Sequence, residues 1–248
     1  MALTYLSYGG GVQSTAILLL ALEGKIELPE FVVFSDTGSE LPETYKTVEE
    51  MKKRCKEAGL HFETVGSKIK GAEPGVSLHE YYLNVDIHPY LPMVTNPRCT
   101  FNFKIYPVRR YVKTRVDKAG PKPWAKSMLG ITTDEAHRMR DSDLKWTENV
   151  YPLIELGWSR KNCIDYIALE YPELSVAKSG CHCCPYQSPK SWIKLRKEHP
   201  DLFAISLEME ERAFSKGHTM GLSQARKLVA YDYTHTLEDF GFQIHTPD

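Results

Sequence analysis

The sequence contains no hydrophobic run that approaches the roughly 20 residues needed to cross a membrane. It also lacks an excess of charge, because 31 Lys and Arg residues nearly balance 32 Asp and Glu residues. The first residues lack a basic stretch followed by an apolar core, so they do not predict a secretory signal. We therefore expect a cytoplasmic protein with no membrane partner. Its 248 residues suit one α/β domain with an appendage.

Disulfide bonds are also not expected, although the chain has six cysteines. Three of them, Cys181, Cys183 and Cys184, fall within four positions, between a glycine and a proline. A knuckle this tight can direct several thiolates at one centre, so it predicts a metal or redox site. Cys55 and Cys163 lie in predicted helices and are expected to be buried packing residues.

A glycine-rich stretch follows the first predicted strand and precedes an apolar helix. Glycines let backbone N–H groups approach an anion, and the start of a helix favours negative charge. No lysine follows, as a Walker A loop requires, and the third glycine of a Rossmann fingerprint would fall on Ser14. The loop alone predicts phosphate binding, and the alternative is an ordinary glycine-rich turn of an α/β protein. Together with the family resemblance given below, it predicts that a nucleotide binds at Ser7, Gly9, Gly10, Gly11, Gln13, Ser14 and Thr15.

A second buried strand is predicted over residues 30–36, ending in Ser35, Asp36 and Thr37. Open parallel sheets bind ligands beyond the carboxyl ends of their strands. These three side chains should therefore lie beside the glycine loop. The alternative for Asp36 is that it only caps the turn that follows.

The segment from Arg98 to Lys126 is strongly basic, with nine Lys or Arg residues against one acid, Asp117. It can be a solvated helix face, or it can contact the phosphates of ATP or of a nucleic acid. The sequence gives both interpretations equal weight.

Several motifs together resemble the PAPS reductase-like branch of the adenine nucleotide alpha-hydrolase (PP-loop ATP pyrophosphatase) superfamily. Gly10, Gly11 and Ser14 are in register with its loop, whereas Gly9 and Gln13 replace the usual serine and aspartate. The string from Phe34 to Gly38 resembles the nucleotide-contacting strand end of that branch.

The resemblance extends to a cysteine, lysine and proline element at Cys99, Lys104 and Pro107, and to a later element with Glu135 and Arg138. It implies that Ser14, Lys104 and Arg138 act on the reacting phosphate and that Glu135 lies near the nucleotide. It also implies a metal centre on Cys99, Cys181 and Cys184. Cys183 or an external sulfur species would complete a [4Fe-4S] cluster, and zinc, with Cys183 or His182 as its fourth ligand, is the alternative.

The family implies a Rossmann-like (HUP-type), mostly parallel sheet with helices on both faces. We expect the nucleotide domain over residues 1–180 and a small helical appendage with the cysteine knuckle over residues 181–248. The favoured function is an ATP pyrophosphatase that activates a nucleic-acid oxygen for tRNA thiolation or DNA phosphorothioation. It would use ATP, Mg²⁺ and an iron–sulfur centre, with a cysteine desulfurase as sulfur donor.

Two alternatives remain open at the level of the sequence. A PAPS or APS reductase would need a nucleophilic cysteine in a C-terminal segment, but none follows Cys184. A non-catalytic nucleotide-binding subunit is suggested by Gln13 in place of the usual aspartate. The acceptor of the sulfur and the oligomeric state do not follow from the sequence.

Overall fold

The computed structural model describes residues 3–84, 91–93, 97–116, 124–217 and 221–222. A five-stranded sheet lies at the centre, in the order β3-β2-β1-β4-β5, and every neighbouring pair is parallel. The strands are β1 (Leu3–Tyr8), β2 (Phe31–Asp36), β3 (His61–Gly66), β4 (Ala125–Met128) and β5 (Thr147–Val150). The carboxyl ends of all five strands therefore meet at one edge. The predicted Rossmann-like α/β fold is confirmed.

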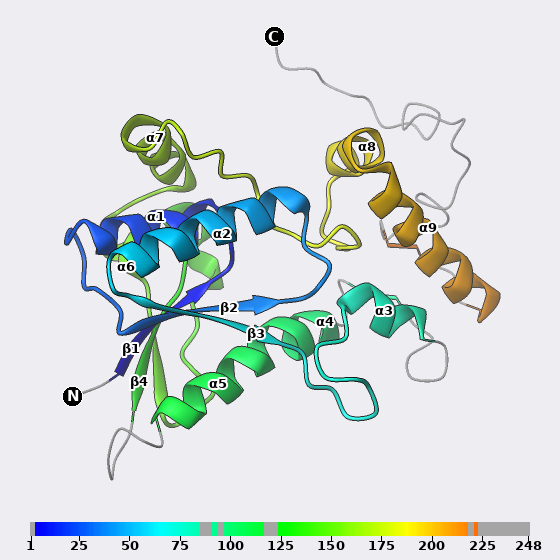
Figure 1. Cartoon of the computed structure of the whole chain (residues 1–248), viewed down its shortest axis with the longest axis horizontal. Coiled ribbons are helices and arrows are strands. Elements are labelled where there is room, and N and C mark those ends of the chain that lie inside the picture. The colour runs from blue at the N-terminus through cyan, green and yellow to red at the C-terminus, as the bar shows by residue number, and fades with distance from the viewer. Residues whose placement is uncertain (1–2, 85–90, 94–96, 117–123, 218–220, 223–248) are drawn as a thin grey trace.

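Helices cover both faces of the sheet (Figure 1). On one face lie α1 (Val12–Leu22), α2 (Pro42–Glu57), α6 (Pro152–Glu155) and α7 (Arg160–Glu170), and on the other lies α5 (Tyr106–Val116). Alternate residues of β1 belong to different cores: Leu6 and Tyr8 pack with α1, whereas Leu3 and Tyr5 pack with α5. Both faces of the strand are apolar, so both must be covered.

The sequence prediction missed some local structure. After β3 lies a short helix that the sequence analysis did not identify, α3 (Leu78–Leu83), which begins with a capping box between Ser77 and Glu80. The predicted basic helix begins with α4 (Arg98–Thr100), continues through a π-helical turn (Phe101–Ile105) and ends with α5. Residues 117–123 of the basic segment lie outside the described residues.

The predicted C-terminal helices are confirmed as α8 (Pro189–Glu198) and α9 (Pro200–Ser215). They pack with α3 and the cysteine knuckle around a second apolar cluster. Leu41 N–H donates to the Gly180 carbonyl, and Glu40 forms an antiparallel bridge with Cys181, which fixes the knuckle to the sheet edge. The boundary near residue 180 remains a prediction, and residues 223–248 lie outside the described part of the chain.

Among the described residues, no helix is both long enough and apolar enough to span a membrane.

Candidate functional site

The glycine loop joins the end of β1 to α1 in a shape that needs glycine. Gly10 has a φ of +69°, and a Cβ there would lie 2.7 Å from Thr44 Cγ2. A Cβ on Gly11 would lie 2.7 Å from Ser179 Oγ. The first turn of α1 has neither a side-chain cap nor an acidic residue. Its backbone N–H groups are therefore free of a local side-chain anion, as an anion-binding helix start requires.

Two hydroxyl groups of the loop have different surroundings. Ser14 Oγ accepts a hydrogen bond from Gly9 N–H at 3.2 Å and donates to the Gly11 carbonyl at 3.2 Å. It therefore closes the loop on itself. Thr15 is fully buried, and its hydroxyl pairs with the Tyr8 hydroxyl at 2.9 Å, so it faces the interior. Ser7 is half-buried in β1, two residues before the loop.

Gln13, Glu135 and Arg138 form a polar network on the other side of the loop. Gln13 Nε2 donates to Glu135 Oε2 at 3.4 Å, and Arg138 Nη1 donates to Glu135 Oε1 at 2.7 Å. Sequence reasoning missed a second cation, Arg160, whose Nη1 donates to Gln13 Oε1 at 2.7 Å. Arg160 lies in the first turn of α7, after the Ser159 cap. No motif in the neighbouring sequence indicates that it contacts the glycine loop. The network presents two guanidinium groups near the loop.

The end of β2 contributes mainly to local structure. Ser35 Oγ donates to the Phe103 carbonyl at 2.6 Å, which ties β2 to the π-helical turn. Asp36 Oδ1 accepts from Gly38 N–H and from the Tyr45 hydroxyl, each at 2.8 Å. In this structure Asp36 therefore stabilises the turn after β2, which is the alternative that the sequence left open.

A buried polar cluster connects the strand end to the cysteine knuckle. Glu40, which the sequence analysis did not select, has a side chain only 1% exposed. Its Oε1 lies 2.8 Å from Lys104 Nζ, accepts from Thr37 Oγ1 at 3.2 Å and lies 3.4 Å from Cys181 Sγ. Thr37 Oγ1 also lies 3.3 Å from the same sulfur atom. Glu40 Oε2 is buried without a hydrogen-bond partner.

Electrostatics in this cluster favour a charged Lys104. Burial alone would lower the pKa of Lys104, but the Cys181 sulfur and the Glu40 carboxylate outweigh that effect and raise its pKa. The lysine side chain is still 41% exposed, and it lines the cavity described below.

The structure brings together the four cysteines predicted to bind metal. Cys99, Cys181, Cys183 and Cys184 belong to one apolar cluster, and the first three are buried. Burial raises the pKa of each of the four thiols. By contrast, Cys55 and Cys163 pack in the core beside α1. Burial raises their pKa values to about 12 and about 11, as expected for inert core thiols.

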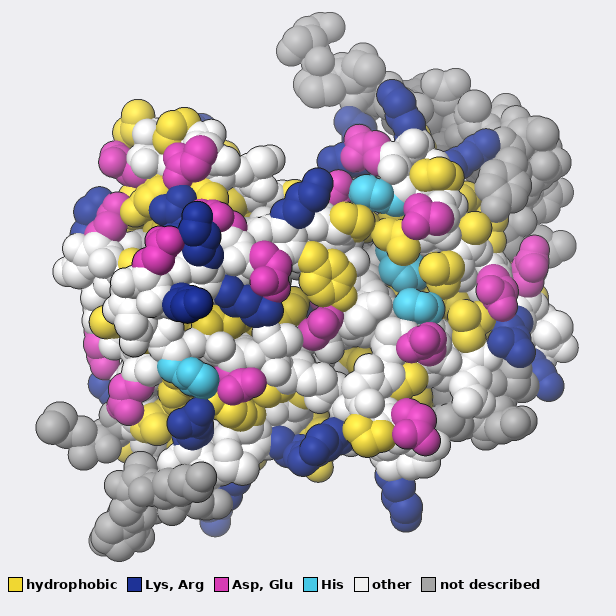
Figure 2. Space-filling model, viewed as in Figure 1, with side chains coloured by type: hydrophobic (Ala, Val, Ile, Leu, Met, Phe, Trp, Pro, Cys, Tyr) yellow, Lys and Arg dark blue, Asp and Glu magenta, His cyan; other side chains and the backbone are white. Residues whose placement is uncertain are grey.

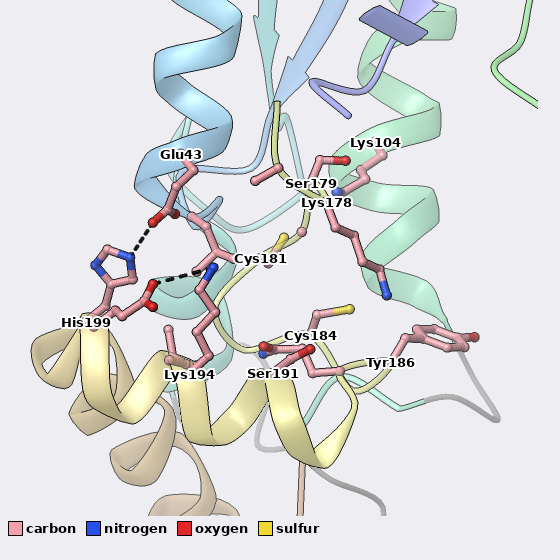
Figure 3. Close-up of a pocket in the computed structure, with 16 residues that line it drawn as sticks. Glu43, Lys104, Lys178, Ser179, Cys181, Cys184, Tyr186, Ser191, Lys194 and His199 are labelled. Atoms are coloured by element: carbon pink, nitrogen blue, oxygen red, sulfur yellow. Dashed lines mark hydrogen bonds and ion pairs between the residues drawn. The ribbon is translucent and has the colours of Figure 1, made fainter. Parts of the chain in front are cut away.

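A cavity of about 310 Å³ opens beside this centre (Figure 3). Cys181 and Cys184 line it, together with three lysines, Lys104, Lys178 and Lys194. Residues of α2, the knuckle and α8 form its walls. Two glutamates, Glu43 and Glu198, line it as well. Basic and acidic side chains are likewise interspersed on the face shown in Figure 2.

His182, the alternative zinc ligand, is buried within the knuckle, between Cys181 and Cys183. Burial lowers its pKa to about 4, so the ring is neutral at physiological pH. Its Nδ1 lies 3.1 Å from Ser206 Oγ, and its Nε2 is buried without a hydrogen-bond partner.

Comparison with known proteins gives one family match. Residues 4–120 match the phosphoadenosine phosphosulfate reductase domain. No curated protein matches the chain. Among solved structures, the chain is similar to the U34-tRNA thiolase NcsA from Methanococcus maripaludis, solved with its [4Fe-4S] cluster. That similarity has 17% sequence identity and a TM-score of 0.39, and it covers 90% of this chain and 76% of the other.

Proposed function

Residues 4–120 match the phosphoadenosine phosphosulfate reductase domain, and on that premise we propose that this chain is an adenylating ATP pyrophosphatase of sulfur transfer. In the proposed reaction, an oxygen of a nucleic-acid acceptor attacks the α-phosphate of ATP, and pyrophosphate leaves. A sulfur nucleophile then attacks the activated carbon or phosphorus atom, and AMP leaves with the oxygen. A cysteine desulfurase is the proposed source of that sulfur.

The nucleotide half of the proposal depends on the first turn of α1. Its uncapped N–H groups and those of Gly9 to Gly11 would hold the pyrophosphate portion, with Ser14 maintaining the loop. Lys104 and Arg138 would offset charge at the reacting phosphate. Mg²⁺ would neutralise the remaining phosphate charge when bound.

The sulfur half depends on the cysteines. Cys99, Cys181 and Cys184 would hold a [4Fe-4S] cluster, and such a cluster supplies an iron site at which sulfur can be held or delivered. The thiols are suited to metal because burial disfavours them as free thiolates, whereas a bound cation would compensate thiolate charge. Cys183, which is fully buried, is the alternative ligand of the fourth iron, and with it bound no iron would be open to sulfur.

A cluster and a single zinc ion differ in the separation that they require between the sulfur atoms. Four thiolates around one zinc at about 2.3 Å lie only about 3.8 Å apart. Among the described residues, no three cysteine sulfurs lie mutually within 4.8 Å, alone or with His182. A cubane takes each thiolate at a different iron and so holds the sulfur atoms farther apart.

One observation carries the proposal: Glu40 contacts both Lys104, from the nucleotide side, and Cys181, from the cysteine centre. The lysine proposed to face the phosphates and a cysteine proposed to bind the cluster therefore share one buried carboxylate. This supports a reaction in which nucleotide activation and sulfur chemistry occur in one site. The lysine-lined cavity beside Cys184 would admit the acceptor.

Product analysis tests the proposal. Anaerobically purified protein is incubated with α-labelled ATP, Mg²⁺, a sulfide source and either total tRNA or plasmid DNA. We expect AMP and pyrophosphate, lost in Lys104→Gln and retained in the surface control Lys52→Gln. ADP and orthophosphate as the only products would contradict attack at the α-phosphate.

The same preparation separates the alternatives. Release of sulfite from PAPS with a thiol reductant would assign the chain as a sulfonucleotide reductase. Tight ATP binding without turnover under any of these conditions would favour a non-catalytic nucleotide-binding subunit.

A further inference from the structure

Three side chains with metal-binding atoms meet at the rim of the cavity, apart from the cysteines. Glu43 lies in the first turn of α2, Glu198 is the last residue of α8, and His199 joins α8 to α9. One ligand atom from each lies within 4.8 Å of the others. Figure 3 shows Glu43 and His199 pointing toward each other, and His199 Nε2 lies 2.9 Å from Glu43 Oε1.

We propose that Glu43, Glu198 and His199 form a binding site for one divalent transition-metal ion, separate from the cysteine centre. Two carboxylates and one imidazole suit Mn²⁺, Fe²⁺ or Zn²⁺, because the nitrogen adds affinity that an all-oxygen site lacks. Solvent would fill the remaining coordination positions, since all three side chains are partly exposed.

The geometry agrees with this donor set. Two ligands at about 2.1 Å from a metal and at right angles to each other lie about 3 Å apart. The observed separation of 2.9 Å between the His199 nitrogen and the Glu43 oxygen matches this distance between two ligands. A metal would replace the proton that the two groups share now, with little movement of either side chain.

The backbone also favours a cation here. Glu198 and His199 stand at the carboxyl end of α8, where the helix dipole is negative. His199 N–H donates to the Leu195 carbonyl at 2.8 Å, and Pro200 follows directly, so the junction between the helices is fixed. Two of the three ligands therefore come from one rigid corner.

A lysine already pairs with one of the two carboxylates of the proposed metal site. Lys194 Nζ lies 3.5 Å from Glu198 Oε2, so it would compete with a metal for that carboxylate. This competition gives the proposal a distinctive test, because removing Lys194 should strengthen metal binding.

The site would join two parts of the molecule. α2 packs on the sheet, whereas α8 and α9 pack with the cysteine knuckle. A bound ion would hold the α8–α9 pair against the sheet domain at the entrance to the cavity. Metal binding should therefore raise the melting temperature even when no nucleotide is present.

Titration with Mn²⁺, followed by electron paramagnetic resonance, tests the site. Mn²⁺ is chosen because it prefers oxygen and nitrogen ligands to thiolates, and nucleotide is omitted so that phosphates contribute nothing. We expect one bound ion and a rise in melting temperature of roughly 5–10 °C at 100 times the dissociation constant.

Variants locate the ion. Glu43→Gln and His199→Gln should each weaken Mn²⁺ binding roughly tenfold or more, since each removes one of three ligands. Lys194→Met should tighten it about threefold. The control Glu211→Gln changes an exposed carboxylate of α9 and should bind as wild type does.

Two results would overturn the proposal, provided that circular dichroism shows folded variants. One is the absence of saturable Mn²⁺ binding to the wild-type protein. The other is a dissociation constant that Glu43→Gln and His199→Gln leave equal to that of Glu211→Gln. Neither result depends on ATP turnover, so the metal site and the proposed enzymatic function are tested separately.

Discussion

Replacing Glu40 by glutamine removes the charge that joins Lys104 to the cysteine centre while keeping the size of the side chain. The Glu40 side chain is 1% exposed, and that of Lys104 is 41% exposed. Breaking a fully buried ion pair costs about 3–5 kcal/mol, and solvent around the lysine reduces that cost. We expect Glu40→Gln to lower the free energy of unfolding by about 1–3 kcal/mol.

A matched control exists on the surface. Glu49 Oε1 lies 2.7 Å from Lys52 Nζ, almost the same separation, but the Glu49 side chain is 69% exposed. Glu49→Gln should therefore change the free energy of unfolding by less than about 0.5 kcal/mol. Urea unfolding of both variants, at equal m-values, measures the difference.

A double-mutant cycle then assigns the effect to the pair. Glu40→Gln and Lys104→Met should show a coupling energy of about 1 kcal/mol or more. The reasoning is refuted if the coupling is zero within error, or if Glu40→Gln is no more destabilising than Glu49→Gln.

Three further predictions concern the loop, its polar network and a core thiol. Gly9→Val should remain folded, because a Cβ there meets nothing closer than 3.9 Å, yet weaken ATP binding in calorimetry. An unchanged ATP affinity in Gly9→Val would place the bound anion elsewhere. Gly10→Val should instead lower the melting temperature, because Gly10 has a φ of +69°, which a valine rarely adopts. Arg160→Gln should raise the KM for ATP roughly tenfold, because the hydrogen bond from Arg160 to Gln13 is lost. An unchanged KM would show that Arg160 does not contribute to ATP binding. Burial raises the pKa of Cys163 from 9.0 to about 11, so the unfolded chain loses this proton first. This thiol alone should therefore contribute a fall in stability of roughly 1–3 kcal/mol between pH 9 and pH 11. Cys163→Ala should show a shallower fall in urea unfolding over that range, and an equal slope would contradict the assignment.

The fold and the clustering of the knuckle cysteines were predictable because their signals are local in the sequence. The apolar residues of β1 and β2 alternate between two cores, and the knuckle places three cysteines within four positions. Cys99 was joined to the knuckle only through the family resemblance. The structure places it in the same apolar cluster as Cys181.

The polar partners were not predictable because they depend on tertiary contacts. Glu40 follows a turn and reads as a solvent-exposed acid, but its backbone bridge to Cys181 buries it. Arg160 reaches Gln13 across 147 positions of sequence. β5, at the edge of the sheet, was missed because three of the four residues of the short string Thr147–Val150 are polar.

The central claim is that Cys99 and the knuckle hold one metal centre beside the nucleotide loop. Iron and acid-labile sulfide analysis of anaerobically purified protein tests it most directly, with Cys99→Ala compared with the core control Cys163→Ala. The account predicts about four irons and four sulfides per chain in wild type and in Cys163→Ala, and near-complete loss of both in Cys99→Ala. A folded Cys99→Ala protein that keeps its full iron and sulfide content would contradict it.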